Sequence, residues 1–249
     1  MKKDSSWESV SSWYDSLVST DGHYFHQHVI FPKLLPLITG KNLKVLDLGC
    51  GQGPLARKLP NATEYLGIDL SPSLIQFAKS KNPNPKIKFM CADATKPLKL
   101  EKDFTDAFMI LCLQNMKNPE GALKNAYKAL APQGRLFLVL NHPAFRIPRQ
   151  SHWGVDEIRK IQFRRLDCYL SELEIPIQKS PSMGEKSATT LSFHKPLSKW
   201  SELLFTSQFL IEKIEEWTSD KVSTGKKARM EDRARKEFPL FLTFICQKR

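Results

Sequence analysis

A glycine-rich turn in the first half of the sequence carries the residues with the clearest chemistry. Asp47-Leu48-Gly49-Cys50-Gly51-Gln52-Gly53 closes the apolar run 44–48. Glycines at a strand end let the chain turn sharply and bring its backbone close to a ligand. Asp69 ends the next apolar run, where a carboxylate can accept hydrogen bonds from both ribose hydroxyls of a nucleoside. The pattern predicts a nucleoside-containing cofactor at the ends of two neighbouring strands.

The same turn argues against a dinucleotide. The dinucleotide turn G-x-G-x-x-G needs a third glycine where this chain has Pro54, and the third glycine, Gly53, comes one residue early. Asp47 would repel a pyrophosphate but suits a cationic ligand. S-adenosylmethionine has no phosphate and carries an ammonium and a sulfonium, so it fits this turn better.

The elements that must position these residues alternate along the chain. Near-continuous apolar runs indicate strands buried on both faces, and Ser71-Pro72 is typical of a helix start because it offers an N-cap serine and an N1 proline. Strands alternating with helices predict a parallel sheet covered on both sides. The expected strands are 44–48, 65–69, 87–91, 106–111, 134–140, 209–214 and 238–246; the expected helices are 54–59, one from 72, 119–130 and 196–208. Residues 219–237 are interpreted as a charged, mobile hairpin loop.

The turn, Asp69 and the segment Cys91-Ala92-Asp93-Ala94 together resemble the signatures of class I S-adenosylmethionine-dependent methyltransferases. The segment 193–197 and the closing run 238–241 are most similar to the small-molecule and quinone branch. The resemblance implies an α/β, Rossmann-like doubly wound sheet of seven strands in the order 3-2-1-4-5-7-6, with strand 7 antiparallel. We expect one domain, 1–249, made of an N-terminal helical lid (1–40), a cofactor-binding core (41–144), an inserted substrate cap (145–195) and a C-terminal helix and strands (196–249).

The resemblance also implies which residues meet the methionine end of the cofactor. Gly49 and Gly51 would let the backbone reach the methionine moiety, and Asp47 would lie near its ammonium. Leu111, at the end of the fourth strand, would contribute backbone near the sulfonium. As an alternative, Asp47 would only stabilise the turn.

At the nucleoside end, Asp69 would bind the ribose and Leu70 would stack on the adenine. Asp93 would accept a hydrogen bond from the exocyclic amine of adenine, with the amide of Ala94 beside it. As an alternative, Asp93 would only cap its strand end.

On the acceptor side, methyl transfer is a direct displacement that needs alignment and desolvation, and a base only when the acceptor must lose a proton. His142 follows the fifth strand and is the preferred base or hydrogen-bond partner. The insertion brings aromatic residues and arginines together, as a roof over a planar or anionic acceptor would, although an amphipathic helix packed on the sheet explains them equally. The further substrate candidates are Tyr14, His28, Asn141, Arg146, Arg149 and Tyr169. His23, His26 and His28 have no Cys or carboxylate companions, so no metal site is predicted.

Charge and composition bound the partners. Lys and Arg total 38 against 26 Asp and Glu, and the resulting +12 keeps nucleic acid open as a partner. No run of five or six like charges occurs, and the segment 113–116 lacks the Asn/Asp-Pro-Pro-aromatic motif of amino-methylating relatives. The scattered cysteines and the lack of a secretory signal or membrane span indicate a cytoplasmic protein.

We therefore expect a methyltransferase that acts on a small-molecule or lipid-like acceptor and leaves S-adenosylhomocysteine as product. The alternatives are a methyltransferase acting on RNA or protein and a non-catalytic module that only binds the cofactor. The sequence leaves the oligomeric state and the methylated atom open.

Overall fold

A seven-stranded sheet forms the centre of the computed structural model, which describes residues 23–40, 42–59, 61–178 and 189–249. The strand order is β10-β11-β5-β4-β1-β2-β3, and β11 runs antiparallel to both of its neighbours while the other pairs are parallel. The predicted fold class and strand order are confirmed, with β11 as strand 7. The strands are β1 (Lys44–Leu48), β2 (Glu64–Asp69), β3 (Ile87–Cys91), β4 (Phe104–Ile110), β5 (Leu130–Asn141), β10 (Phe209–Trp217) and β11 (Phe241–Lys248).

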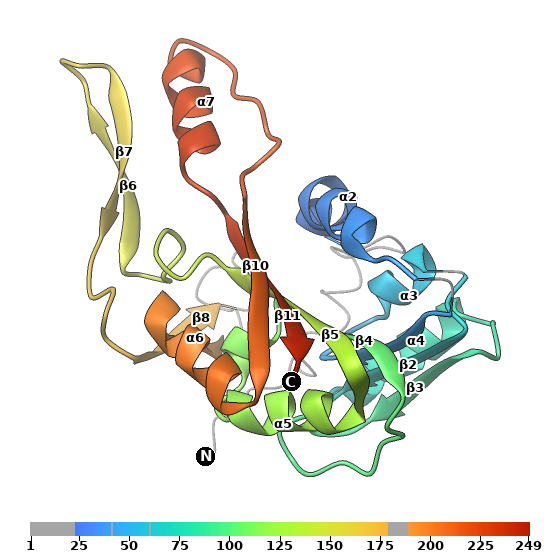
Figure 1. The fold of residues 1–249 in the computed structure, drawn as a ribbon. Coiled ribbons are helices and arrows are strands. Elements are labelled where there is room, and N and C mark those ends of the chain that lie inside the picture. Colours follow the sequence, from blue (N-terminus) through green and yellow to red (C-terminus); the bar gives the residue numbers. More distant parts are fainter. Residues whose placement is uncertain (1–22, 41, 60, 179–188) are drawn as a thin grey trace.

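Helices cover both faces of this sheet, as its apolar strands require (Figure 1). One face is covered by α3 (Pro54–Lys58), α4 (Pro72–Lys81) and the N-terminal helical segment. That segment is continuous through the π-helical turn η2 (His26–Ile30), α2 (Phe31–Leu34) and the 3₁₀ turn η3 (Leu35–Leu37). The other face is covered by α5 (Pro119–Ala129) and α6 (Leu197–Thr206). No helix in the described part of the chain is long and apolar enough to cross a bilayer.

Two of these helices start at the signals that the sequence contains. The Ser71 hydroxyl accepts a hydrogen bond from the Leu74 amide at 3.3 Å, immediately before Pro72 opens α4. The Asn118 side chain accepts one from the Gly121 amide at 3.2 Å, immediately before the proline that opens α5. Each cap satisfies one amide that the first helical turn leaves without a backbone partner.

The region after β5 and the region after β10 differ from the sequence interpretation. The insertion consists of two hairpins rather than an amphipathic helix: β6 (Ser151–Asp156) with β7 (Ile161–Leu166), and β8 (Leu173–Gln178) with β9 (Thr189–His194). The prediction of a loop over 219–237 is wrong for its second half, where α7 (Ala228–Glu237) forms. Helix-favouring Ala, Arg, Met, Glu and Lys residues build α7, which packs against β7. Figure 1 shows α7 and the β6–β7 hairpin extending from the same end of the sheet.

Candidate functional site

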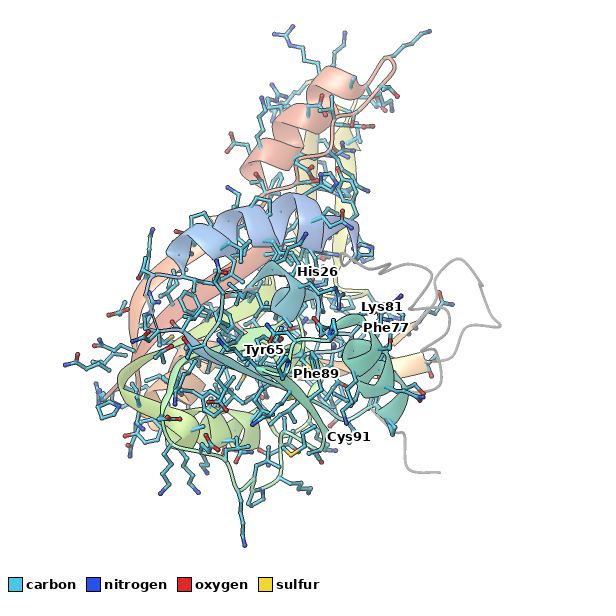
Figure 2. The ribbon with its side chains drawn as sticks, turned by 90° about the vertical axis from the view of Figure 1, so that its right-hand side faces the viewer. His26, Tyr65, Phe77, Lys81, Phe89 and Cys91 are labelled. Atoms are coloured by element: carbon cyan, nitrogen blue, oxygen red, sulfur yellow. The ribbon has the colours of Figure 1, made fainter. Side chains whose placement is uncertain are left out.

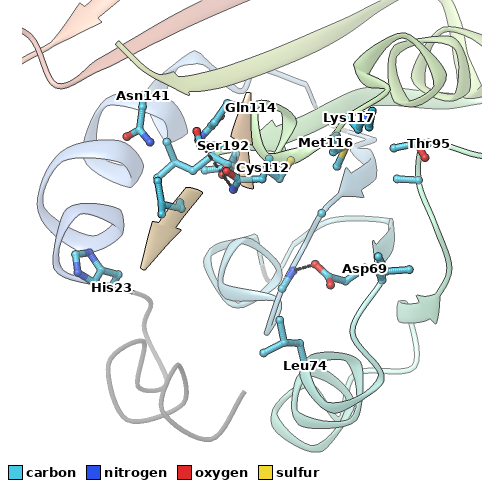
Figure 3. Close-up of a pocket in the computed structure, with 18 of the residues that line it drawn as sticks. His23, Asp69, Leu74, Thr95, Cys112, Gln114, Met116, Lys117, Asn141 and Ser192 are labelled. Carbon is cyan, nitrogen blue, oxygen red and sulfur yellow. Dashed lines mark hydrogen bonds between the residues drawn. The ribbon is translucent and has the colours of Figure 1, made fainter. Parts of the chain in front are cut away.

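A cavity of about 650 Å³ opens at the carboxyl ends of the parallel strands. This is the edge where open α/β sheets bind ligands, and the volume lies within the roughly 300–1,000 Å³ typical of small-molecule sites. Figure 3 shows Asp69 and Leu74 on one side of the cavity and Asn141, Gln114 and Ser192 together on the other.

The glycine turn presents bare backbone to this cavity. Gly49, Gly51 and Gly53 have φ angles of +75°, +54° and +69°, in the left-handed region that favours glycine. The amides of Gly49 and Cys50 donate to the Ile68 carbonyl at 2.7 and 3.0 Å, which holds the turn against β2. A Cβ built at Gly51 would meet no described atom within 4 Å, whereas one at Gly49 would lie 2.6 Å from the Cys112 Cβ. The turn therefore forms an open cradle at Gly51, the shape that a closely held ligand needs.

The Asp69 carboxylate lies beside this cradle in a fixed orientation. Its Oδ2 accepts a hydrogen bond from the Gly51 amide at 2.8 Å, and its Oδ1 accepts one from the Ser71 amide at 2.9 Å (Figure 3). A carboxylate has about four acceptor positions, so both oxygens keep capacity for ribose hydroxyls. Leu70, which follows, lines the cavity with 42% of its surface exposed, leaving an apolar face uncovered at the position predicted to stack on adenine.

Asp93 and Ala94 line the same end of the cavity, after β3. The Asp93 Oδ1 accepts hydrogen bonds from the Thr95 amide at 2.9 Å and the Thr95 hydroxyl at 2.6 Å. Both described hydrogen bonds use the same oxygen, so Oδ2 is available to accept from an amino group. The Ala94 carbonyl accepts from the Asn125 side chain at 2.8 Å, which fixes this loop on α5.

Asp47 lies under the turn rather than in the main cavity. Its carboxylate is 2% exposed and accepts a hydrogen bond from the Tyr65 hydroxyl. Burial raises the pKa of Asp47 to about 7, against the lowering effect of the Tyr65 hydrogen bond. Asp47 lines a small adjoining cavity together with Gly49, Gly51 and His26. Its contact with the ammonium of the cofactor remains a prediction.

The residue that follows β4 carries backbone strain in the wall of the cavity. Leu111 has a φ of +55°, which is unfavourable for a residue with a Cβ and is found mainly where the surroundings enforce it. Its amide donates to the Val139 carbonyl at 2.8 Å, and its carbonyl accepts from the side chains of Gln114 at 3.0 Å and Asn115 at 3.3 Å. The Gln114 Oε1 is buried with no partner among the described residues. Sequence reasoning missed Gln114 and Asn115 as site residues, although their place directly after a parallel strand was the available signal.

On the acceptor side, Asn141 and Arg146 line the cavity as the sequence predicted, together with Phe25, Ser192 and Phe241. The last three were not singled out from the sequence as substrate residues. Phe241 is the register partner of Asn141 across β11 and β5, so the topology brings it to the same edge.

His142 is buried beside the cavity and both of its ring nitrogens are engaged. Nδ1 accepts hydrogen bonds from the amides of Ala144 at 3.2 Å and Phe145 at 3.3 Å, so Nε2 carries the proton and donates to Glu216 at 2.7 Å. Burial lowers the pKa of His142, although Glu216 partly raises it again. This geometry leaves no lone pair for an acceptor proton and does not support His142 as the base. The side chain anchors the loop after β5 to β10.

The other predicted substrate residues do not line the cavity. Tyr14 lies outside the described residues. His28 stacks on Tyr24 with ring centroids 4.3 Å apart and pairs with Asp220 at 3.6 Å. Arg149 is exposed, and the Tyr169 hydroxyl accepts a hydrogen bond from the Leu197 amide at 3.2 Å.

The N-terminal helical segment and the residues before it contribute two histidines to the cavity wall. His23 and His26 both line it, and Figure 2 shows His26 on the side of the helix that faces the sheet. Burial lowers the pKa of His26 to about 4, so its imidazole is neutral at pH 7. Within the described ranges, no three His, Cys, Asp or Glu side chains are grouped to hold a metal ion.

Comparisons with known proteins agree with this geometry. Residues 46–138 match the family described as "Methyltransferase domain". The chain is 32% identical to a demethylmenaquinone methyltransferase of Tropheryma whipplei over 114 residues, 45% of this chain and 46% of that protein. It is 33% identical to a ubiquinone biosynthesis O-methyltransferase of Coxiella burnetii over 120 residues, 44% of this chain and 50% of that protein. The chain thus spans about half the length of the curated relatives it matches.

The likeness to solved structures extends further along the chain. An S-adenosylmethionine-dependent methyltransferase from Mesorhizobium loti superposes with a TM-score of 0.70 at 23% identity, covering 88% of this chain and 97% of that one. The matched domain over residues 46–138 and the shared fold agree with the resemblance to class I S-adenosylmethionine-dependent methyltransferases that the turn predicted. They imply S-adenosylmethionine as the cofactor, and the open cradle at Gly51 beside the oriented Asp69 carboxylate fits that group.

Proposed function

We propose that this chain is a methyltransferase that transfers the methyl group of S-adenosylmethionine to a small-molecule acceptor. The observation that carries the proposal is one continuous cavity that joins the glycine turn and Asp69 to Asn141 and Arg146. A cofactor held by the glycine turn and Asp69 would leave Asn141 and Arg146 in reach of a second ligand. Relatives named for quinone biosynthesis support a small and largely apolar acceptor.

The residues of the turn and of the strand ends would hold the cofactor. Asp69 would accept from the ribose hydroxyls, since Gly51 and Ser71 fix its carboxylate without exhausting its acceptor positions. Asp93 would accept from the adenine amine through Oδ2, and Leu70 would cover the adenine face. When bound, S-adenosylmethionine supplies an electrophilic methyl group on a sulfonium.

The protein's contribution to transfer is alignment and exclusion of water. Leu111 directly follows β4, which lies between β1, the strand before the glycine turn, and β5, the strand that ends at Asn141. Its strained backbone would therefore lie between cofactor and acceptor. Phe25 and Phe241 pack edge to face, with centroids 5.7 Å apart, and form an apolar wall on the acceptor side. For an acceptor that must lose a proton, His23 and His26 are the cavity-lining imidazoles among the described residues.

The division into lid, core, cap and C-terminal segment, the preference for a small molecule over nucleic acid as the partner, and a cytoplasmic location stay predictions. The five free cysteines support the location.

The proposed function is tested with cofactor labelled in its methyl group and an extract of small molecules, RNA and protein. Label in the small-molecule fraction is the expected result, and Asp69→Asn should abolish it. The control is Asp103→Asn, because Asp103 is an exposed carboxylate paired with Lys44 outside the cavity. Label confined to RNA or protein would contradict the acceptor class, and cofactor binding without any labelled product would indicate a binding module.

A further inference from the structure

The acceptor end of the cavity has a positive charge without a matching carboxylate. The acidic residues that line the cavity, Asp69 and Asp93, follow β2 and β3 at the cofactor end. Arg146 lines the opposite end, in the loop after β5. Glu216, a carboxylate on the adjacent β10, is hydrogen-bonded to His142. Among the described residues, no carboxylate lines this end of the cavity.

The Arg146 guanidinium is partly buried and unpartnered. Its carbon lies 5.5 Å from the centroid of the Phe241 ring, which covers one face of the planar group. No described residue accepts a hydrogen bond from its five N–H donors or forms an ion pair with it. Buried guanidinium groups are normally paired, so the open edge is a site for an acceptor that arrives with a ligand.

Neighbouring groups add to the positive potential. The pKa of His23 is lowered mainly by burial and further by the positive charges of Lys221 and Arg146. Both cations therefore lie close enough to His23, in the cavity wall, to affect it electrostatically. The Lys221 ammonium lies over the rings of Tyr24 and Phe25, at 4.7 and 5.2 Å. Cations that face aromatic rings rather than carboxylates keep their charge available to an anionic ligand.

The position of Arg146 separates it from the glycine turn. Phe241 begins β11, which is three strands away from β1 in the sheet order, or about 14 Å at the usual strand spacing. The carboxylate of the cofactor itself is expected near the turn that follows β1. Arg146 is thus placed for the second ligand rather than for the cofactor.

We propose that Arg146 binds a carboxylate on the methyl acceptor, so that the substrates are small carboxylic acids with an apolar, aromatic-sized body. This inference rests on the proposed function. A ring over one face of a guanidinium leaves its in-plane N–H donors open, and a pair of these donors matches a carboxylate held through two hydrogen bonds. Phe25 and Phe241 would contact the apolar body, and Asn141, Ser192 and the unpartnered Gln114 Oε1 would meet its polar substituents.

The test measures binding of 1-naphthoate and the uncharged 1-naphthamide by calorimetry, with and without S-adenosylhomocysteine. We expect naphthoate to bind at least tenfold more tightly than naphthamide to the wild-type chain. Arg146→Met should remove this difference, and Arg146→Lys should keep only part of it because lysine has the charge but not the paired donors. Arg229→Met is the control, since Arg229 is an exposed arginine of α7 outside the cavity.

Equal binding of naphthoate and naphthamide to the wild-type chain would overturn the proposal, whether or not the variants fold. So would an Arg146→Met chain that keeps its preference for naphthoate but binds S-adenosylhomocysteine tenfold more weakly, because the anion would then be the carboxylate of the cofactor. Failure of the wild-type chain to bind S-adenosylhomocysteine would contradict the proposed function instead, and the naphthoate titration without it would still test Arg146.

Discussion

Replacing Gly51 with alanine separates the cofactor cradle from the stability of the fold. The Gly51 backbone has a φ of +54°, and an added Cβ would meet no described atom within 4 Å. Gly51→Ala should therefore lower the free energy of unfolding only through the left-handed conformation, by roughly 1–2 kcal/mol. For a chain of this size that lowers the melting temperature by roughly 2–8 °C.

The effect on the cofactor should be larger, because the new methyl group would fill the space in which the ligand approaches the backbone. S-adenosylhomocysteine at a hundred times its dissociation constant should stabilise the wild-type chain by about 2.7 kcal/mol. We expect Gly51→Ala to weaken binding at least tenfold, which removes about 1.4 kcal/mol of that stabilisation. Thermal unfolding with and without S-adenosylhomocysteine measures both effects.

Gly225→Ala is the matched control. Gly225 has a φ of +85° and equally open surroundings, but it does not line the cavity. It should lose similar stability and keep the full ligand-induced shift. A Gly51→Ala chain with an undiminished shift would refute the cradle.

Three further predictions concern buried ionisable side chains. Arg135→Met should cost about 3–5 kcal/mol in urea unfolding, because it leaves the 2% exposed Asp106 carboxylate without the guanidinium that donates to it at 2.7 and 3.0 Å; a loss under about 1 kcal/mol would contradict this. The pKa of about 4 for His26 means that the unfolded chain binds a proton that the folded chain does not, so stability should fall by about 2 kcal/mol from pH 7 to pH 5 through this group. His26→Phe should remove that part of the slope, and an unchanged slope would argue against it. If the cofactor ammonium lies near Asp47, binding should lower the Asp47 pKa from about 7 and release protons at neutral pH. Calorimetry in two buffers of different ionisation enthalpy should show this proton release for the wild type and not for Asp47→Asn.

The strands of the central sheet were predictable because their burial on both faces leaves near-continuous apolar runs. The predicted strand 106–111, for example, overlaps β4 (Phe104–Ile110), and the residues after such runs could be assigned to one edge of the sheet from the sequence alone. This reasoning also predicted Asn141 at that edge, and Asn141 lines the cavity. It requires only local composition and the handedness rules of parallel sheets.

The remaining elements depend on contacts that are distant in sequence. Only Ala234 of α7 is buried, so no apolar stripe marked that helix. The role of His142 depends on contacts of both ring nitrogens: the amides of Ala144 and Phe145 occupy the Nδ1 lone pair that a base would need, and Glu216, 74 residues away, accepts the proton on Nε2. Gln114 likewise gains significance only because its oxygen is buried without a partner, which no spacing in the sequence indicates.

A crystal structure of the chain with S-adenosylhomocysteine tests the central claim most directly. The account predicts ribose hydroxyls on the Asp69 carboxylate, adenine between Leu70 and Asp93, and the sulfur directed past Leu111 toward Asn141. A ligand bound elsewhere, or bound here with its ribose away from Asp69, would contradict it.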